Sequence, residues 1–277
     1  MRSALYVPGN RPEMLAKALQ RGADAVLLDL EDSVAPAEKD AARAASAAWL
    51  SGLPPAGTTP GPEIWVRINH GPPGLTDTAA VALPAVTGLL VPKTEHVDEL
   101  HAVAAELADV PGIALCPLLE SAAALLAAPL LAHGPRVTRV QLGEADLRAD
   151  TGIQPGEDER ELLWARSQLV LASAAARLAP PLGPVSTDFR DLDALRRSTL
   201  ALRRLGFGGR ACVHPAQLAV VNEVFTPGER ELDRARLLIA RYEGAGSGAA
   251  VDDSGRMIDE AVVRQARRLL STAPRHP

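Results

Sequence analysis

The chain has 277 residues, of which 47% are apolar and 3% aromatic, and its formal net charge is −5 with a pI near 5.7. This apolar content excludes a disordered chain and is typical of one large α/β barrel or two small domains, with Ala, Leu and Val filling the core. The sequence lacks the basic footprint of a nucleic-acid-binding protein and has no run near the ~20 apolar residues of a membrane span, so we expect a soluble, cytoplasmic protein with no nucleic-acid or membrane partner.

Short apolar runs alternate with longer amphipathic stretches along most of the chain. The runs predict eight strands, at Ala4–Val7, Ala25–Asp29, Ile64–Ile68, Gly88–Val91, Ile113–Leu119, Val137–Leu142, around Val185 and at Ala211–Val213. The longer stretches predict helices at Pro12–Arg21, with Asn10 as its N-cap, and at Glu38–Leu50, Glu95–Leu107, from Ser121, Glu161–Ala176, Asp191–Leu205, Gln217–Val224 and Glu229–Tyr242.

Eight strand–helix units in this order favour a parallel sheet that closes into a barrel. The strands are continuous apolar runs, which is typical of strands buried on both faces. An open, doubly wound sheet is the alternative, but no G-x-G-x-x-G follows the first strand, so a dinucleotide-binding fold is not favoured. The sequence therefore predicts an α/β fold, a (β/α)₈ TIM barrel, as a catalytic domain over residues 1–243.

The two cysteines, Cys116 and Cys212, have no spacing typical of a zinc or redox motif. Each lies in an apolar, strand-like run. We therefore expect buried free thiols, as in a reducing cytoplasm.

The last part of the chain has a different composition. Gly244–Ala250 is rich in small residues and is expected to be a flexible linker. An amphipathic helix, Asp259–Leu270, follows it. Residues 244–277 are therefore predicted to form a linker and a C-terminal helical lid segment.

Polar side chains follow the predicted strands, and the active sites of such barrels gather at the carboxyl ends of their strands. In chain order these residues are Asp29, Glu31 and Asp32, then Arg67 and Asn69, Lys93, Glu120, Glu144 and Asp146, Asp188, and His214. Carboxylates crowded at one mouth repel each other unless a cation joins them, and oxygen ligands without Cys or His favour Mg²⁺ over Zn²⁺. Because their strands are neighbours, Glu120 and Asp146 are predicted to share one magnesium ion.

Plainer interpretations exist for several of these residues. Asp29 and Asp188 are as well explained as caps of helix starts, and His214, which precedes a proline, is better explained as a hydrogen-bonding residue of a turn than as a base. Glu31 and Asp32 are adjacent in what we take as extended chain, so they are expected to point apart, with at least one orienting Arg67 or holding a metal-bound water. The combination of Arg67, Glu120 and Asp146 after three apolar strands is the sharper signal.

Motifs along nearly the whole chain resemble the citrate lyase beta-subunit group of the HpcH/HpaI aldolase family. They are Arg2-Ser3-Ala4-Leu5-Tyr6-Val7-Pro8-Gly9-Asn10-Arg11-Pro12, Leu28-Asp29-Leu30-Glu31-Asp32-Ser33-Val34, Val66-Arg67-Ile68-Asn69, Val91-Pro92-Lys93, Leu119-Glu120-Ser121, Gly143-Glu144-Ala145-Asp146-Leu147, Val213-His214-Pro215 and Gly255-Arg256-Met257-Ile258-Asp259. In one of them, the family's usual Gly-Ala-Glu-Asp has its middle pair reversed as Gly143-Glu144-Ala145-Asp146.

The resemblance implies a homotrimer of (β/α)₈ barrels in which Glu120 and Asp146 hold Mg²⁺ and Arg67 holds the carboxylate and carbonyl oxygens of a 2-oxo acid. Lys93 is expected to bind substrate as well, and Asp32 to take part in catalysis. The Met-Ile-Asp motif of the family belongs to a lid that closes over a neighbouring subunit's barrel. That motif assigns Asp259 as a catalytic acid/base acting in trans.

The function expected from this resemblance is Mg²⁺-dependent carbon–carbon cleavage of a hydroxyacyl-CoA thioester of the citryl-CoA, malyl-CoA or citramalyl-CoA type. The products would be a 2-oxo acid such as oxaloacetate and an acyl-CoA. One alternative is a metal-dependent 2-oxo acid aldolase without coenzyme A. The other is a non-catalytic metabolite-binding subunit.

Overall fold

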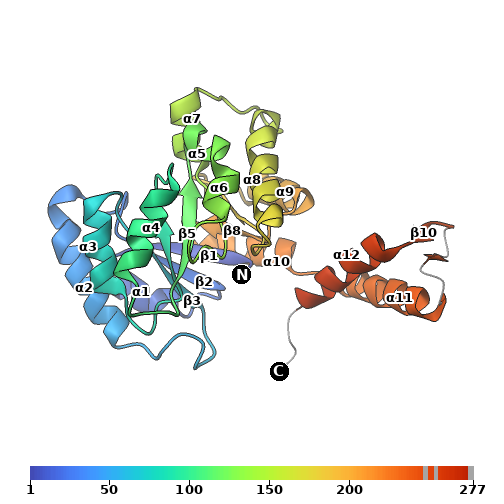
Figure 1. Cartoon of the computed structure of the whole chain (residues 1–277), viewed down its shortest axis with the longest axis horizontal. Helices are drawn as coiled ribbons and strands as arrows, with labels where there is room; N and C mark the ends of the chain where they lie inside the picture. Colours follow the sequence, from blue (N-terminus) through green and yellow to red (C-terminus); the bar gives the residue numbers. More distant parts are fainter. Residues whose placement is uncertain (246–248, 253–254, 274–277) are drawn as a thin grey trace. The chain divides into compact units, whose positions relative to one another are not determined.

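The eight predicted strand–helix units form a closed, all-parallel barrel (Figure 1). The computed structural model describes residues 1–245, 249–252 and 255–273. The strands run in chain order around the barrel, as β1 Ser3–Pro8, β2 Ala25–Asp29, β3 Glu63–Arg67, β4 Gly88–Val91, β5 Ala114–Leu119, β6 Gln141–Leu142, β7 Leu182–Gly183 and β8 Gly209–Cys212. The barrel predicted from the sequence is confirmed.

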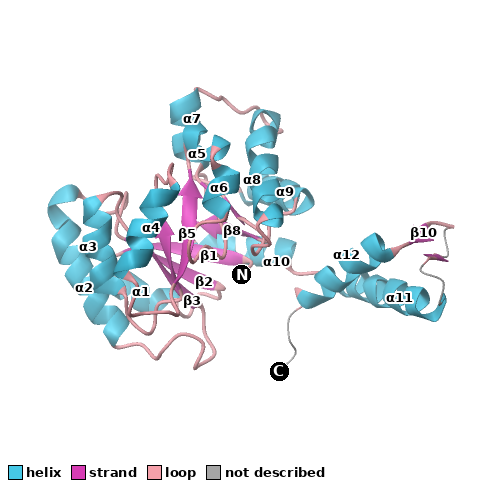
Figure 2. Cartoon of the chain, viewed as in Figure 1, coloured by secondary structure: helices cyan, strands magenta, loops and turns pink. Residues whose placement is uncertain are grey.

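Helices surround this barrel on its outer side (Figure 2). They are α1 Pro12–Ala18, α2 Lys39–Ser51, α3 Pro72–Val81, α4 Val97–Glu106, α5 Ala122–Leu126, α6 Ala128–Ala132, α7 Glu144–Thr151, α8 Leu163–Ala175, α9 Leu192–Leu205 and α10 Leu218–Phe225. Three short 3₁₀ turns, Pro36–Glu38, Arg160–Leu162 and Pro215–Gln217, precede α2, α8 and α10. Two of the helices, α3 and α7, are absent from the sequence prediction.

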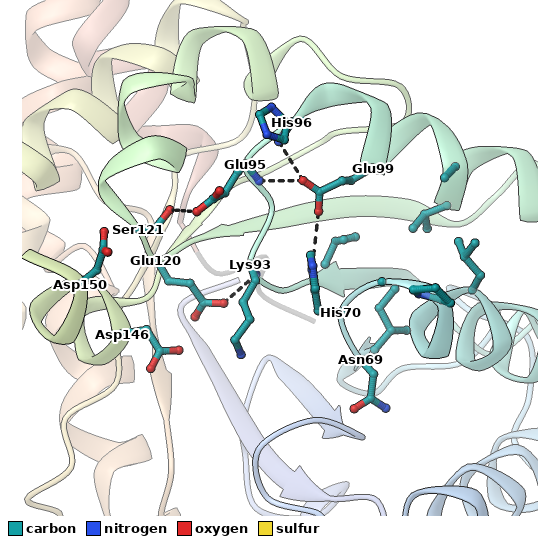
Figure 3. A pocket seen from close by; sticks show the side chains of 17 residues that line it. Asn69, His70, Lys93, Glu95, His96, Glu99, Glu120, Ser121, Asp146 and Asp150 are labelled. Carbon is teal, nitrogen blue, oxygen red and sulfur yellow. Dashed lines mark hydrogen bonds and ion pairs between the residues drawn. The ribbon is translucent and has the colours of Figure 1, made fainter. Parts of the chain in front are cut away.

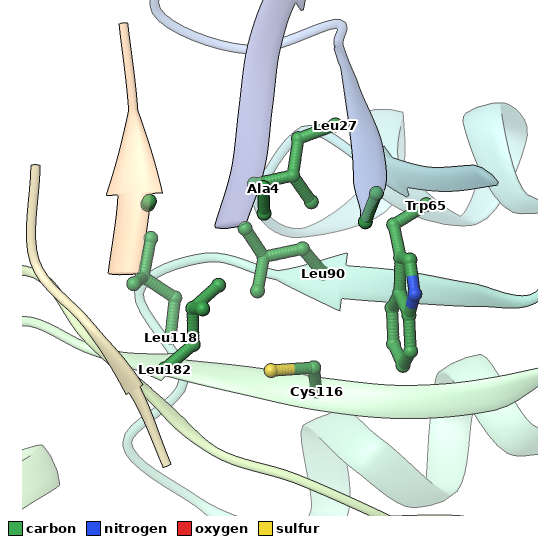
Figure 4. Packing of buried hydrophobic residues seen from close by; sticks show 9 residues of the cluster. Ala4, Leu27, Trp65, Leu90, Cys116, Leu118 and Leu182 are labelled. Atoms are coloured by element: carbon green, nitrogen blue, oxygen red, sulfur yellow. The ribbon is translucent and has the colours of Figure 1, made fainter. Parts of the chain in front are cut away.

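The barrel interior is filled mainly by aliphatic side chains, as the low aromatic content predicts (Figure 4). Trp65 is an aromatic exception, and its ring lies where a side chain at Gly88 would be: a Cβ atom there would come within 2.3 Å of the indole. Cys116 and Cys212 are buried free thiols, as predicted. Burial raises the pKa of each thiol to about 12, so neither is a reactive thiolate at neutral pH.

Three local predictions are wrong. The seventh strand is Leu182–Gly183, and Val185 lies beyond it, because Pro184 has no N–H to continue the ladder. The sixth strand covers only Gln141–Leu142 of the predicted run. Asn10 does not cap α1; its amide donates a hydrogen bond to Glu38 at 2.6 Å.

The chain divides into two compact units, Met1–Asn222 and Glu223–Pro277, so the second begins earlier than the predicted lid segment. It contains α11 Glu229–Ala245, a hairpin of β9 Ala250–Val251 and β10 Met257–Ile258, and α12 Glu260–Ser271. The predicted linker is only partly described, since residues 246–248 lie outside the described part. Nowhere in the described residues is a helix long and apolar enough to cross a membrane.

Candidate active site

Arg67 is held at the carboxyl ends of the first strands by a network of carboxylates. In the parallel register its partner on β2 is Asp29, so the two side chains meet. Asp29 accepts from Arg67 Nε at 2.6 Å and from Nη2 at 2.7 Å, and Tyr6 lies under the guanidinium, 5.0 Å from its ring centroid. Although burial opposes it, the bonds from Arg67 hold the pKa of Asp29 below its usual range.

Asp29 also accepts the backbone N–H groups of Glu31 and Ser33, at 2.9 and 3.1 Å. Asp29 therefore caps a turn and not a helix start as predicted, because the next helical segment begins only at Pro36. These bonds fold the segment after β2 into a turn. Because the segment is a turn and not extended chain, Glu31 and Asp32 do not point apart as predicted: both reach Arg67 Nη1, at 2.9 and 3.0 Å.

Lys93 connects this network to the next part of the mouth. Its ammonium group pairs with Glu31, and its backbone N–H donates to Glu120 Oε1 at 2.7 Å. A φ of 51° places it in the left-handed region, which is uncommon for a residue with a side chain. In this conformation the side chain of Lys93 pairs with Glu31 while its backbone N–H donates to Glu120.

Glu120 is buried after β5, and its carboxylate has little compensation. Burial, together with the negative charges of Glu31 and Asp146, raises its pKa to about 8, against the opposing effects of the backbone N–H and the positive charge of Lys93. Asp146 lies in the first turn of α7. Figure 3 shows Glu120, Asp146 and Lys93 facing the same space.

The carboxylates of Glu120 and Asp146 repel each other unless a cation lies between them, and their oxygen atoms are suitable ligands for magnesium. Among the described residues no cluster of three or more His, Cys, Asp or Glu side chains is arranged to hold a metal. Mg²⁺ commonly binds through one or two carboxylates and takes its remaining ligands from water and substrate oxygens. A buried, uncompensated carboxylate beside a second one is the donor set that such a cation would stabilise.

The remaining predicted residues take structural positions. His214 caps the turn before α10 by accepting the Ala216 N–H at 3.1 Å, as the turn interpretation predicts. Asp188 accepts the N–H groups of Arg190 and Asp191 in the turn before α9, whose cap is Asp191, so Asp188 does not cap a helix start as predicted. Asn69 is held by Asp77 at 2.6 Å. In the second unit, Asp259 caps α12 by accepting the Val262 N–H at 3.0 Å.

Sequence reasoning missed Tyr6, Gln141 and Arg166. Gln141 donates to the Tyr6 hydroxyl at 3.1 Å, and its buried Oε1 has no partner. The signal for Gln141 in the sequence was that a polar amide side chain lies inside an apolar run. Arg166, buried on α8, binds Glu144 through two nitrogens, at 2.6 and 2.9 Å. Glu144 therefore turns to this arginine instead of completing a three-carboxylate cluster.

Two cavities meet at Glu120 and Asp146. The smaller, about 400 Å³, is lined by Tyr6, Arg67 and Gln141 as well as by the two carboxylates. The larger, about 680 Å³, extends toward α3 and α4 and is lined by apolar side chains and by His70, His96 and Glu99 (Figure 3). Glu120 and Asp146 thus line both the cavity that contains Arg67 and the larger one.

The chain is similar to known proteins over nearly its full length. The model of the HpcH/HpaI aldolase/citrate lyase family matches residues 2–215. The chain is 34% identical to the citrate lyase subunit beta-like protein of Deinococcus radiodurans, over 98% of this chain and 96% of the relative. It is 33% identical to mitochondrial citramalyl-CoA lyase of Mus musculus, over 98% of this chain and 86% of the relative. The CitE protein of Mycobacterium tuberculosis, in a crystal structure with magnesium, acetoacetate and coenzyme A, superposes with a TM-score of 0.81 at 30% identity, over 98% of this chain and 97% of that one.

Proposed function

Because this chain belongs to the HpcH/HpaI aldolase/citrate lyase family, we propose how its own residues divide the work of that chemistry. The protein is a magnesium-dependent carbon–carbon lyase that acts on coenzyme A thioesters. It converts a hydroxyacyl-CoA into an acyl-CoA and a 2-oxo acid such as oxaloacetate. We propose below which side chains bind the substrate and which take part in the reaction.

One observation carries the assignment: Arg67, Glu120 and Asp146 converge on one cavity from β3, β5 and the start of α7. We assign Glu120 and Asp146 as the ligands of magnesium, which supplies Lewis acidity to the substrate oxygens. Arg67 stabilises the oxygen on which charge develops as the carbon–carbon bond breaks.

The hydrogen bonds of Arg67 indicate which of its nitrogen atoms would contact the substrate oxygen. Its Nε and Nη2 are committed to Asp29, whereas Nη1 faces Asp32, which lines the cavity. Nη1 also pairs with Glu31, so we propose that a substrate oxygen reaches Nη1 from the cavity by taking the place of the exposed Asp32. Glu31, buried between Arg67 and Lys93, holds both cations in place. We assign Asp32 and Lys93 to the substrate-facing rim of this network.

The two cavities suit the two halves of the substrate. The smaller contains Arg67 and accepts the 2-oxo acid half. The larger is lined by the apolar residues Ile68, Leu75, Val91 and Val103, and Lys93 is the only Lys or Arg in its lining, so it favours the uncharged acyl and pantetheine portion over the phosphates of coenzyme A.

Asp259 is proposed to act on the thioester side, from the lid of a neighbouring subunit over residues 244–277. Its capping bond to α12 fixes one carboxylate oxygen and leaves the other available. An Asp259→Asn chain mixed with a Glu120→Ala chain should recover part of the activity in mixed oligomers. If the two folded variants exchange subunits and regain none, the lid does not act in trans.

The proposed homotrimer would also cover an apolar surface on neighbouring helices. Leu126, Leu130, Trp164 and Leu171 on α5, α6 and α8 are 59–72% exposed, which is unusual for large apolar side chains on one face. Sedimentation should give three chains per particle, and Trp164→Glu should shift it toward smaller species. A monomeric wild type would contradict this. The buried free thiols support the proposed cytoplasmic location.

The deciding experiment is a panel of hydroxyacyl-CoA thioesters incubated with and without Mg²⁺ and followed by mass spectrometry. Release of a 2-oxo acid together with an acyl-CoA, only with Mg²⁺, is the expected result. Release of the free hydroxy acid would instead indicate thioester hydrolysis. Aldol cleavage of hydroxy-oxo acids without coenzyme A, or binding without turnover, would favour the two alternatives raised by the sequence.

A further inference from the structure

A buried ion cluster lies directly behind the helix that carries Asp146. Arg166 on α8, 3% exposed, is bound through Nε and Nη2 by Glu144, the first residue of α7. Its Nη1 is bound by Glu159 at 2.8 Å. Burial opposes the charge, but the bonds from both carboxylates raise the pKa of Arg166, so Arg166 stays charged.

Helix α7 has few other attachments to the barrel. Over its eight residues only Leu147 is buried, so apolar packing cannot fix its position firmly. At its start, Gly143 lies against Glu120: a Cβ atom there would come within 2.6 Å of Glu120 Cβ and 2.7 Å of Oε2. The first turn is therefore held by Glu120 on one side and by Arg166 on the other.

We propose that Arg166 and Glu144 are positioning residues for the magnesium site. Asp146 lies two residues after Glu144 in the same helical turn, so fixing Glu144 fixes the distance from Asp146 to Glu120. A two-point bond to a guanidinium restricts both position and orientation, which a single contact does not. The proposal rests on the metal assignment to Glu120 and Asp146.

The same arrangement explains the reversed order of Glu144 and Ala145. Consecutive helix residues point about 100° apart, so a carboxylate at position 145 would not face Arg166 as Glu144 does. Glu144 and Ala145 both line the smaller cavity, but the Glu144 carboxylate is bound by Arg166. With Glu144 committed to Arg166, no added carboxylate at position 145 enters the substrate compartment.

The test measures Mg²⁺ affinity directly by calorimetry, without substrate, alongside thermal unfolding in the absence of metal. Glu144→Gln keeps the shape and removes the charge, and should weaken Mg²⁺ binding about 10- to 100-fold, as the loss of groups that orient metal ligands does. Glu144→Asp, which keeps the charge, should lose less. Glu144→Ala/Ala145→Glu should bind Mg²⁺ no better than Glu144→Ala.

The matched control is Asp24→Asn, which breaks an ion pair with Arg2 (2.7 Å) at the other end of the strands. It should lower thermal stability and leave Mg²⁺ affinity within about twofold, since distant sites act independently. If Glu144→Gln also loses only stability, the cluster is merely structural and the inference is wrong. If the wild type binds no Mg²⁺, the metal assignment itself fails, which is a separate outcome. Should Glu144→Gln not fold, Arg166→Lys gives the same reading, with a loss of metal affinity expected.

Discussion

The two halves of the barrel mouth handle buried charge in opposite ways. Around Arg67, three carboxylates and two cations compensate one another, and the pKa of Asp29 is lowered. At Glu120 the compensation is one backbone N–H, and the pKa is raised to about 8. Asp29 and Glu120 are both buried, so the opposite shifts of their pKa values come from their partners. The first half is compensated by its own cations, whereas the second is where we propose that magnesium binds.

The largest expected effect comes from removing either carboxylate of the second half. Glu120→Ala or Asp146→Ala should abolish Mg²⁺-dependent turnover, by about a thousandfold or more, because metal stabilisation of developing charge is worth several kcal/mol. The barrel should remain folded, since neither side chain anchors an ion pair. Activity and Mg²⁺ affinity are the measurements. Full retention of both by either variant removes that residue from the metal site.

Arg67→Lys tests the compensated half. A lysine cannot bind Asp29 through two nitrogens and still present an edge to the cavity. We expect the affinity for oxaloacetate-like ligands to fall about 100-fold while Mg²⁺ binding changes little. Calorimetry with each ligand separates the two effects. Unchanged affinity for the 2-oxo acid would place it elsewhere.

Glu31 and Asp32 should differ although they are adjacent. The Glu31 side chain is 8% exposed and bridges two cations, whereas that of Asp32 is 60% exposed. Glu31→Gln should reduce turnover about 10- to 100-fold, and Asp32→Asn by only a few-fold, because water screens its pairing with Arg67. Steady-state kinetics of the two variants decides this. An equal or reversed order would mean that Asp32 contacts the substrate more directly.

The smallest effect concerns acid stability. The pKa of Asp29 is lowered in the folded protein, so its contribution is present above its ordinary unfolded value of about 3.9 and is lost as the pH falls through the folded value. Asp29→Asn should therefore make the unfolding free energy depend less steeply on pH below about 4, by at most ~1.4 kcal/mol per pH unit. Urea unfolding at several pH values measures the slope, and identical slopes would contradict the ionised pair.

The barrel and the mouth residues were predictable because apolar strands in order, each followed by a polar residue, leave little freedom in where those residues meet. Arg67, Lys93, Glu120 and Asp146 reach one mouth for that reason. The partner of Glu144 was not predictable, because an ion pair between residues 22 apart leaves no local pattern. Helices α3 and α7 escaped notice because the first begins Pro-Pro-Gly and the second buries a single side chain.

The two halves of the barrel mouth also come from different parts of the chain, and the half around Arg67 is synthesised first. Tyr6, Asp29, Arg67 and Lys93 come from β1, β2, β3 and the end of β4, before Glu120 or Asp146 has been translated. Because the chain is synthesised from its amino terminus, the residues that neutralise the charge of Arg67 are all present by the end of β4. The proposed magnesium ligands Glu120 and Asp146 are made later, so the metal site cannot be assembled until β5 and α7 have been synthesised.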